Sequence, residues 1–196
     1  MFAVNDIKCP GCGAPQKYDS EICEYCGRPV IITSVRTAGT LAAGELKKYA
    51  DVYRKEYSAD PENTKVGLSL GICLYELKLY DNAVNVLRRC IETDFDDPEL
   101  YYYLALSSLK GRKPFNVPRK EIDKIEEYLN TAIALSPCGV YYYLFAYIRY
   151  DHHHRKMYVM DPDYTELLRK AQQCGITEAD KAELFRAIGV TRPSAL

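Results

Sequence analysis

The sequence predicts a mainly α-helical protein that contains repeated helix pairs and a small β module at its N-terminus. Two observations lead to this prediction. From residue 41 onward, apolar residues recur every three or four positions, the periodicity of helices with one buried face. Before that point, four cysteines in two Cys-x-x-Cys pairs lie within segment 1–32, as expected for a module folded around a metal ion. The 196 residues suffice for such a module and one domain of ordinary size.

The composition excludes some classes of protein. With 47% hydrophobic and 27% charged residues, the chain is globular rather than disordered. Its 26 basic and 27 acidic residues give a net charge of −1, which disfavours broad electrostatic attraction to nucleic acid or to an anionic membrane. The sequence shows no signal peptide and no apolar run of the roughly 20 residues that span a bilayer. We therefore expect a cytoplasmic protein with reduced cysteines and no membrane partner.

The two cysteine pairs are the most specific chemical signal in the chain. They lie ten residues apart, and each is followed at once by a glycine, Gly13 or Gly27. A glycine can take a positive φ, which permits a tight turn with backbone N–H groups facing the sulfurs. The predicted zinc ligands are Cys9, Cys12, Cys23 and Cys26. Four thiolates with no open position are typical of one structural Zn²⁺ rather than of a catalytic metal.

Segment 7–30, with its Cys-Pro-x-Cys-Gly and Cys-x-Tyr-Cys-Gly phrases, resembles the zinc-ribbon family in its short bacterial-type form. The resemblance implies that the four cysteines are the metal ligands and that residues 1–32 form a β ribbon. Free or redox-active cysteines are the alternative, although a thioredoxin-like motif needs only one pair in a βαβ context. Residues 1–32 carry three basic and four acidic side chains, so nucleic-acid binding by the ribbon alone is disfavoured.

The chain after the ribbon is expected to consist of a linker and a helical domain. Residues 33–40 are small and polar and predict the linker, which leaves 41–196 for the helical domain. The first helix is predicted from residue 41 or 45 to Tyr57. A last helix over 177–188 would cover the end of the helical stack, and Thr177 is its predicted N-cap.

Between these two capping helices the sequence repeats a pattern of small and large residues. The first unit, Thr64 to Glu92, alternates them as two closely crossing helices require. The pattern that opens at Thr64 restarts at Pro98, and a third, weaker unit opens at Gly139. Prolines and glycines predict irregular turns within the second and third units, at 111–120 and 152–163.

Residues 61–176 resemble the tetratricopeptide-repeat family, whose unit has the same length as the interval from Thr64 to Pro98. The expected fold class is therefore mainly α, a short tetratricopeptide-like α-solenoid with a small N-terminal β zinc ribbon. The resemblance implies a concave surface along the first helices of the units, where tyrosine triplets occupy equivalent places at 101–103 and 141–143. The candidate partner-binding residues on this surface are Leu68, Ile72, Tyr75, Tyr102, Leu106, Tyr142 and Arg149.

The kind of partner follows from the residues on this surface. Family members that capture a C-terminal carboxylate have a lysine and an asparagine at the places of Leu68 and Ile72, so that mode of binding is disfavoured. An apolar or aromatic-anchored peptide or helix is the better candidate. The alternative is that the tyrosines only pack between helices.

The remaining cysteines and histidines have structural interpretations. Four cysteines are expected to pack between helices, namely Cys73, Cys90, Cys138 and Cys174. Consecutive histidines at 152–154 cannot all face one metal from a helix, so a polar turn is favoured over a metal site. The sequence has no glycine-rich phosphate loop, nucleophile elbow or His-Glu-x-x-His motif. We therefore expect no enzymatic activity.

The sequence thus favours a non-enzymatic adaptor in which a structural zinc ribbon precedes helical repeats that bind a protein or peptide. Two alternatives stay open. One is nucleic-acid association through the ribbon and a set of basic residues, namely Lys47, Lys48, Arg54, Lys55 and the loop 112–120. The other is a regulatory subunit of an enzyme complex.

Overall fold

The computed structural model describes residues 6–17 and 20–196. The chain divides between Phe95 and Asp96 into two compact units, here called unit 1 and unit 2. Both units are mainly helical, and within the described ranges a single two-stranded sheet lies near the N-terminus. The predicted fold class, mainly α with a small N-terminal β module, is confirmed.

Unit 1 begins with the β module. Strand β1 (Asp6–Lys8) pairs antiparallel with β2 (Pro15–Lys17), and Ile7 lies opposite Gln16. Both of these central residues are buried. Because each strand has only three residues, the sheet depends on the surrounding chain for its stability.

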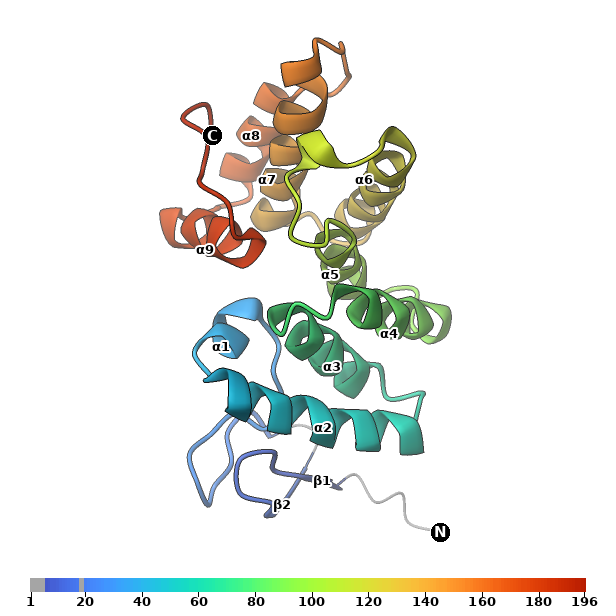
Figure 1. The fold of residues 1–196 in the computed structure, drawn as a ribbon, viewed down its shortest axis with the longest axis vertical. Helices are drawn as coiled ribbons and strands as arrows, with labels where there is room; N and C mark the ends of the chain where they lie inside the picture. The colour runs from blue at the N-terminus through green and yellow to red at the C-terminus, as the bar shows by residue number, and fades with distance from the viewer. Residues whose placement is uncertain (1–5, 18–19) are drawn as a thin grey trace. The chain divides into compact units, whose positions relative to one another are not determined.

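Four helices complete unit 1. They are α1 (Val35–Gly39), α2 (Ala43–Ala59), α3 (Thr64–Glu76) and α4 (Tyr80–Thr93), coloured light blue to green in Figure 1. Helix α2 packs against α3, and α3 packs against α4. The buried face of α2 is the one that the periodicity predicted, with Leu46, Tyr49, Ala50, Tyr53 and Tyr57.

Helix α1 lies in the segment expected to be a linker. The Ser34 side chain caps it by accepting a hydrogen bond from the Thr37 N–H. Val35 and Ala38 are buried, and α1 packs against α3. The two apolar side chains within a largely polar segment account for this helix.

The crossing of α3 and α4 confirms the predicted use of small residues. A Cβ atom added to Gly71 would lie 2.7 Å from Leu87 Cδ2, and one added to Gly67 would overlap Cys90 Sγ. Cys90 itself is buried at this crossing. Cys174 is exposed, so the expectation that it packs between helices is wrong. The small residues therefore let the two backbones approach closely.

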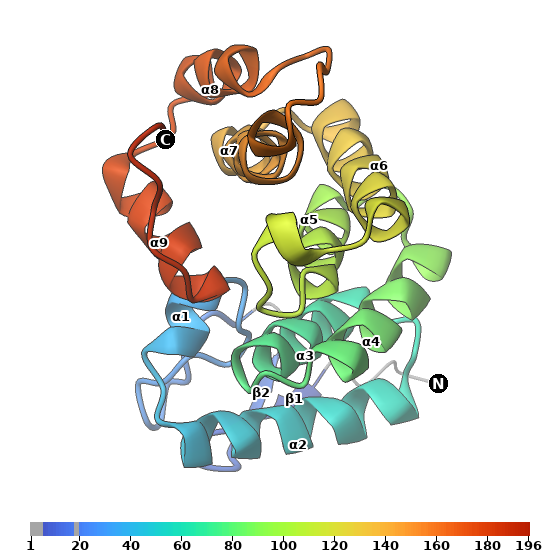
Figure 2. The ribbon, with the colours of Figure 1, turned by 45° about the horizontal axis from the view of Figure 1, so that its top comes forward.

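Unit 2 contains two further helix pairs and a terminal helix (Figure 2). Its helices are α5 (Pro98–Ser108), α6 (Arg119–Leu135), α7 (Gly139–Ile148), α8 (Tyr164–Gln173) and α9 (Glu178–Ile188). Helix α5 packs against α6, α7 against α8, and α6 also contacts α7. The irregular turn predicted between α5 and α6 contains a short 3-10 helix, η1 (Pro114–Asn116).

Helix α7 continues beyond the point where the sequence predicted a turn. A π-helical turn, η2 (Arg149–His153), and a 3-10 turn, η3 (His154–Lys156), follow it directly. His152 and His153 are buried, whereas His154 is exposed. The prediction of a polar turn at 152–154 is therefore wrong. Two of the three histidines belong to the interior, where Glu126 of α6 supplies a polar partner to His153.

The C-terminal cap has the predicted form. Thr177 and Asp180 make a reciprocal capping box at the start of α9, and Gly189 ends the helix with a φ of 75°. The backbone carbonyl of Leu196 accepts a hydrogen bond of 2.9 Å from the Tyr143 hydroxyl, which fixes the C-terminal segment to α7. Within the described residues, no helix combines the length and the apolar character needed to cross a bilayer.

Candidate functional site

Four cysteines of unit 1 converge to form what we call the cysteine centre. It consists of Cys9, Cys12, Cys23 and Cys26, whose Sγ atoms all lie within 4.8 Å of one another. The Sγ atoms are 3.7 Å apart in the pair Cys9–Cys26 and also in the pair Cys12–Cys23. Zinc–sulfur bonds of about 2.3 Å at tetrahedral angles place the sulfurs about 3.8 Å apart. The four thiols are not disulfide-bonded, and their spacing fits a single tetrahedral ion.

The two halves of the centre are built by the same backbone turn. In each half, the N–H of the glycine four residues after the first cysteine donates a 2.8 Å hydrogen bond to that cysteine's carbonyl: Gly13 to Cys9 and Gly27 to Cys23. Both glycines have positive φ angles, 80° and 69°. The matching glycines in the sequence therefore mark two equivalent turns.

The electrostatics of the centre also suit a cation. Burial raises the pKa of the Cys9 thiol to about 12. At Cys23 burial also acts to raise the pKa, but the N–H groups of Tyr25 and Cys26, together with the neighbouring thiols, lower it to about 7. Several thiolates this close together need a counter-charge, and a bound divalent ion would deprotonate them. Cys9, Cys12, Cys23 and Cys26 are therefore the residues that could hold a metal.

The cysteine centre is attached to the helices of unit 1. The Tyr53 hydroxyl donates a buried hydrogen bond of 2.7 Å to the carbonyl of Val30, and the Tyr49 hydroxyl donates one of 3.0 Å to Pro29. Arg28 and Glu45 form an ion pair. Two tyrosines on the buried face of α2 thus fix the backbone that follows the second cysteine pair.

The seven predicted partner-binding residues do not form an exposed surface. Leu68, Ile72, Tyr75, Tyr102, Leu106 and Arg149 are all buried, and only Tyr142 is half-buried. Tyr102 stacks on Tyr141 with ring centroids 4.9 Å apart. The structure therefore places the tyrosines between helices, which is the alternative that the sequence left open.

A second cluster of ionisable side chains lies inside unit 2 and was not predicted. Glu126 of α6 forms an ion pair of 3.1 Å with Arg149, and its other oxygen lies 2.7 Å from His153 Nε2. These three residues, here called the Glu126 cluster, are all buried. One signal was available in the sequence, because Glu126 shares the buried stripe of α6 with Ile122 and Leu129.

Several nitrogen atoms of this region have no hydrogen-bond partner within the described part of the chain. They are Nε and Nη1 of Arg149 and Nδ1 of His152 and His153. Arg149 and His153 line a cavity of about 250 Å³ that also contacts Tyr158 and Tyr164. Burial lowers the pKa of Arg149, and it lowers the pKa of His152 to about 4. This cavity is large enough for water molecules that would satisfy the unpaired atoms of Arg149 and His153.

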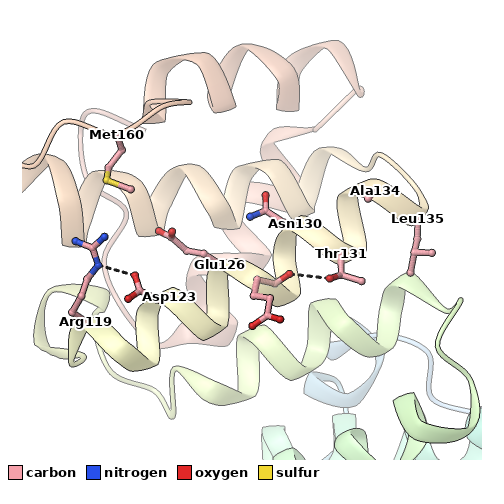
Figure 3. Close-up of a pocket in the computed structure, with 9 residues that line it drawn as sticks. Arg119, Asp123, Glu126, Asn130, Thr131, Ala134, Leu135 and Met160 are labelled. Atoms are coloured by element: carbon pink, nitrogen blue, oxygen red, sulfur yellow. Dashed lines mark hydrogen bonds and ion pairs between the residues drawn. The ribbon is translucent and has the colours of Figure 1, made fainter.

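A larger open groove follows the outer face of α6, and we call it the α6 groove (Figure 3). Its volume is about 690 Å³. The lining residues are Arg119, Asp123, Glu126, Glu127, Asn130, Thr131, Ala134, Leu135 and Met160. One end holds the ion pair between Arg119 and Asp123, with Met160 nearby, and the other end holds Ala134 and Leu135. The groove thus changes from charged to apolar along the helix.

Among the comparisons with known proteins, the search of solved structures gives a likeness in fold. No family model and no curated protein matches the sequence. Among solved structures, one titled "MamA MSR-1 C2" has a TM-score of 0.47 and 19% sequence identity, covering 72% of this chain and 77% of that chain. Both values are too low to transfer a function.

Proposed function

We propose that the protein is a non-enzymatic protein-interaction module, in which the cysteine centre holds one structural zinc ion and the α6 groove receives a segment of a partner protein. The observation that carries the proposal is the α6 groove. It is an open depression along one face of a helix, on a scaffold of packed helix pairs.

The dimensions of the groove suit a peptide segment. Its residues on α6 recur every three or four positions, so they form one continuous face of the helix. Helix α6 has 17 residues and is about 25 Å long. Asp123, Glu127 and Leu135 on this face are exposed. A helical or extended segment with a basic residue toward Glu127 and an apolar residue toward Leu135 would match it.

The cysteine centre is proposed to stabilise the fold rather than to react. All four of its protein ligands are thiolates, which leaves a tetrahedral ion with no position for a substrate. Loading purified protein with zinc and measuring metal by elemental analysis should give about one equivalent per chain. A ratio near zero for folded protein would refute the zinc assignment.

The groove is tested by site-specific crosslinking. A photoreactive residue placed at Asn130, inside the groove, is compared with one at Lys124, which is exposed on α6 but outside it. We expect a discrete crosslinked protein from position 130 alone, and its loss when Leu135→Asp is added. Equal crosslinking from both positions would overturn the groove assignment.

Nucleic-acid association has less support. Of the basic residues considered for it, Arg54 pairs with Asp51, Arg112 with Glu121, and Arg119 with Asp123. These pairs engage three of the eight basic side chains considered, which reduces the charge left for phosphate contacts.

A further inference from the structure

Unit 2 carries an unusually exposed apolar loop after η3. Val159 is 98% exposed, Met157 is 90% exposed and Tyr158 is 52% exposed. Met157 has a left-handed backbone, with a φ of 61°, which ends η3 and turns the chain. Aliphatic side chains this exposed within one short loop point to an interaction rather than to packing within the chain.

Positive charge is concentrated beside this loop. The segments 110–120 and 151–160 contain seven cationic side chains and one carboxylate, although the whole chain has a net charge of −1. The cations are Lys110, Arg112, Lys113, Arg119, Lys120, Arg155 and Lys156. The balance of the whole chain therefore conceals a local basic region.

The two segments form one surface. The Phe115 ring of η1 lies 4.7 Å from the Arg155 guanidinium carbon and 4.9 Å from Lys156 Nζ. The Phe115 N–H also donates a 2.8 Å hydrogen bond to Asp151. Phe115 is 39% exposed and adds to the apolar area. Together, Phe115, Lys156 and residues 157–159 form what we call the basic apolar tip.

The lysines are the charges that this surface offers to a partner. Three arginines already pair with carboxylates: Arg112 with Glu121, Arg119 with Asp123 and Arg155 with Asp151. In the part of the chain that the structure describes, Lys113, Lys120 and Lys156 have no carboxylate within ion-pair distance, so their ammonium groups are available.

A polar cavity of about 260 Å³ lies beside the tip and includes two of these cations. Lys113 and Arg155 line it together with the hydroxyl-bearing Tyr150, Thr191 and Ser194. Its one carboxylate, Asp151, already accepts hydrogen bonds on both oxygens, from Arg155 and from the Phe115 N–H. Cations and hydroxyl groups are the donors that a phosphate group requires.

We propose that the basic apolar tip docks unit 2 onto a bilayer that contains anionic phospholipids. Met157 and Val159 enter the boundary between headgroups and acyl chains, Tyr158 lies at the interface, and the lysines and the Lys113 cavity contact phosphates. This activity goes beyond the proposed protein interaction.

Lipid fits the surface better than nucleic acid does. The rings of Phe115 and Tyr158 are each covered by cations, with the Arg119 guanidinium carbon 5.7 Å from the Tyr158 centroid, so they are not free to stack on bases. Contact with nucleic acid would also leave the apolar side chains of Met157 and Val159 exposed to water, whereas acyl chains would bury them.

The test is co-sedimentation of the full, zinc-loaded chain with vesicles. We expect binding to vesicles made of seven parts phosphatidylcholine and three parts phosphatidylserine, weakening with salt, and none to pure phosphatidylcholine. Lys113→Gln with Lys156→Gln should reduce the affinity about 25-fold, since each lysine near an anionic surface contributes about fivefold. Met157→Ser with Val159→Ser should reduce it at least tenfold. Lys47→Gln with Lys48→Gln, exposed in unit 1, is the matched control and should change nothing.

Three results would overturn the proposal. The first is equal binding to neutral and anionic vesicles. The second is anionic binding that the control substitutions reduce as much as the tip substitutions. The third is binding to duplex DNA or to a polyglutamate peptide that is as tight as the binding to anionic vesicles and is unchanged by the serine substitutions. That result would mean general attraction to polyanions. Circular dichroism of each variant verifies that the helices are intact.

Discussion

The cysteine centre of unit 1 and the Glu126 cluster of unit 2 both gather ionisable side chains, but they balance charge differently. The cysteine centre contains only groups that become negative, with all four sulfurs within 4.8 Å. The Glu126 cluster contains the carboxylate of Glu126, the guanidinium of Arg149 and the imidazole of His153, so the chain supplies both signs of charge. Deprotonation of the first therefore calls for a cation from outside, whereas the chain itself balances the charges of the second.

This difference decides what each region tolerates. Removing a bound metal would break the bonds that join the two cysteine turns and leave almost no core to hold them, because a segment this small buries few apolar side chains. Losing one member of the Glu126 cluster leaves a single unpaired charge inside an otherwise well-packed unit.

Metal removal should have the largest effect. Structural zinc contributes on the order of 10 kcal/mol to the folding of modules of this size. After chelation, hydrogen exchange of amides near Cys9 and Cys23 should become fast, whereas amides of α7 in unit 2 should keep their protection. Cys23→Ser should reproduce the effect. Cys174→Ser, an exposed cysteine outside the centre, is the control and should change neither region.

If exchange near Cys9 stayed slow after complete metal removal, docking on α2 would have to be enough to hold the cysteine centre. The cysteine centre would then not depend on a metal for its stability, and the contrast with the Glu126 cluster would fail.

The same contrast explains what the sequence could predict. The cysteine centre is made by two local turns, so the spacing of its residues and two glycines suffices to predict it. The small residues at the α3–α4 crossing are likewise visible within one repeat. The Glu126 cluster joins residues 23 and 27 positions apart on different helices, and no local pattern shows that Arg149 and His153 will meet Glu126.

The predicted partner surface required knowing which face of each helix is exposed, and periodicity cannot show this for a helix that is buried on all sides. In α3 every residue from Val66 to Tyr75 is buried, so the helix is apolar all round and has no face that the sequence marks as open. The open groove instead follows α6, whose outer face is polar and therefore looks like an ordinary solvated helix in the sequence.

Glu126→Gln should have the second largest effect. It leaves the Arg149 guanidinium buried without a counter-charge, which costs about 3–5 kcal/mol of unfolding free energy. Urea denaturation followed by circular dichroism measures this change. Glu127→Gln, the adjacent exposed position, should change the unfolding free energy by less than about 0.5 kcal/mol.

A double variant makes this test specific to charge. Glu126→Leu with Arg149→Met removes both charges and should recover much of the stability lost in Glu126→Gln, because a buried ion pair is often no better than apolar packing. No recovery would mean that the cluster matters for its shape rather than for its balance of charge.

Acidification should weaken unit 2 through His152. Burial, with the nearby Lys156 and His153, lowers the His152 pKa to about 4, whereas an unfolded histidine titrates near pH 6.5. Between these values the unfolded chain binds more protons than the folded chain. The stability conferred by neutral His152 is thus complete above about pH 6.5 and is lost as the pH falls toward 4, by up to about 3 kcal/mol.

The measurement is hydrogen exchange of α7 amides between pH 7 and pH 4, corrected for the intrinsic rates. His152→Leu keeps a similar volume but removes the titrating group, so it should flatten the pH dependence. His154→Gln, at the exposed neighbour, should leave the dependence intact. A profile that His152→Leu does not alter would assign the pH dependence to other groups.

Tyr53→Phe should have the smallest effect and measures the stability that the cysteine centre gains from the helices rather than from a metal. It removes the 2.7 Å hydrogen bond to the Val30 carbonyl and leaves that buried oxygen unpaired, which costs about 1–3 kcal/mol. Because this cost is small beside the expected contribution of the metal, the cysteine centre of zinc-loaded protein should stay folded, and zinc should dissociate only modestly faster. If Tyr53→Phe released zinc as completely as Cys23→Ser, the anchoring by α2 and the metal would form one cooperative unit, and the cysteine centre would depend on the chain's own contacts as much as the Glu126 cluster does.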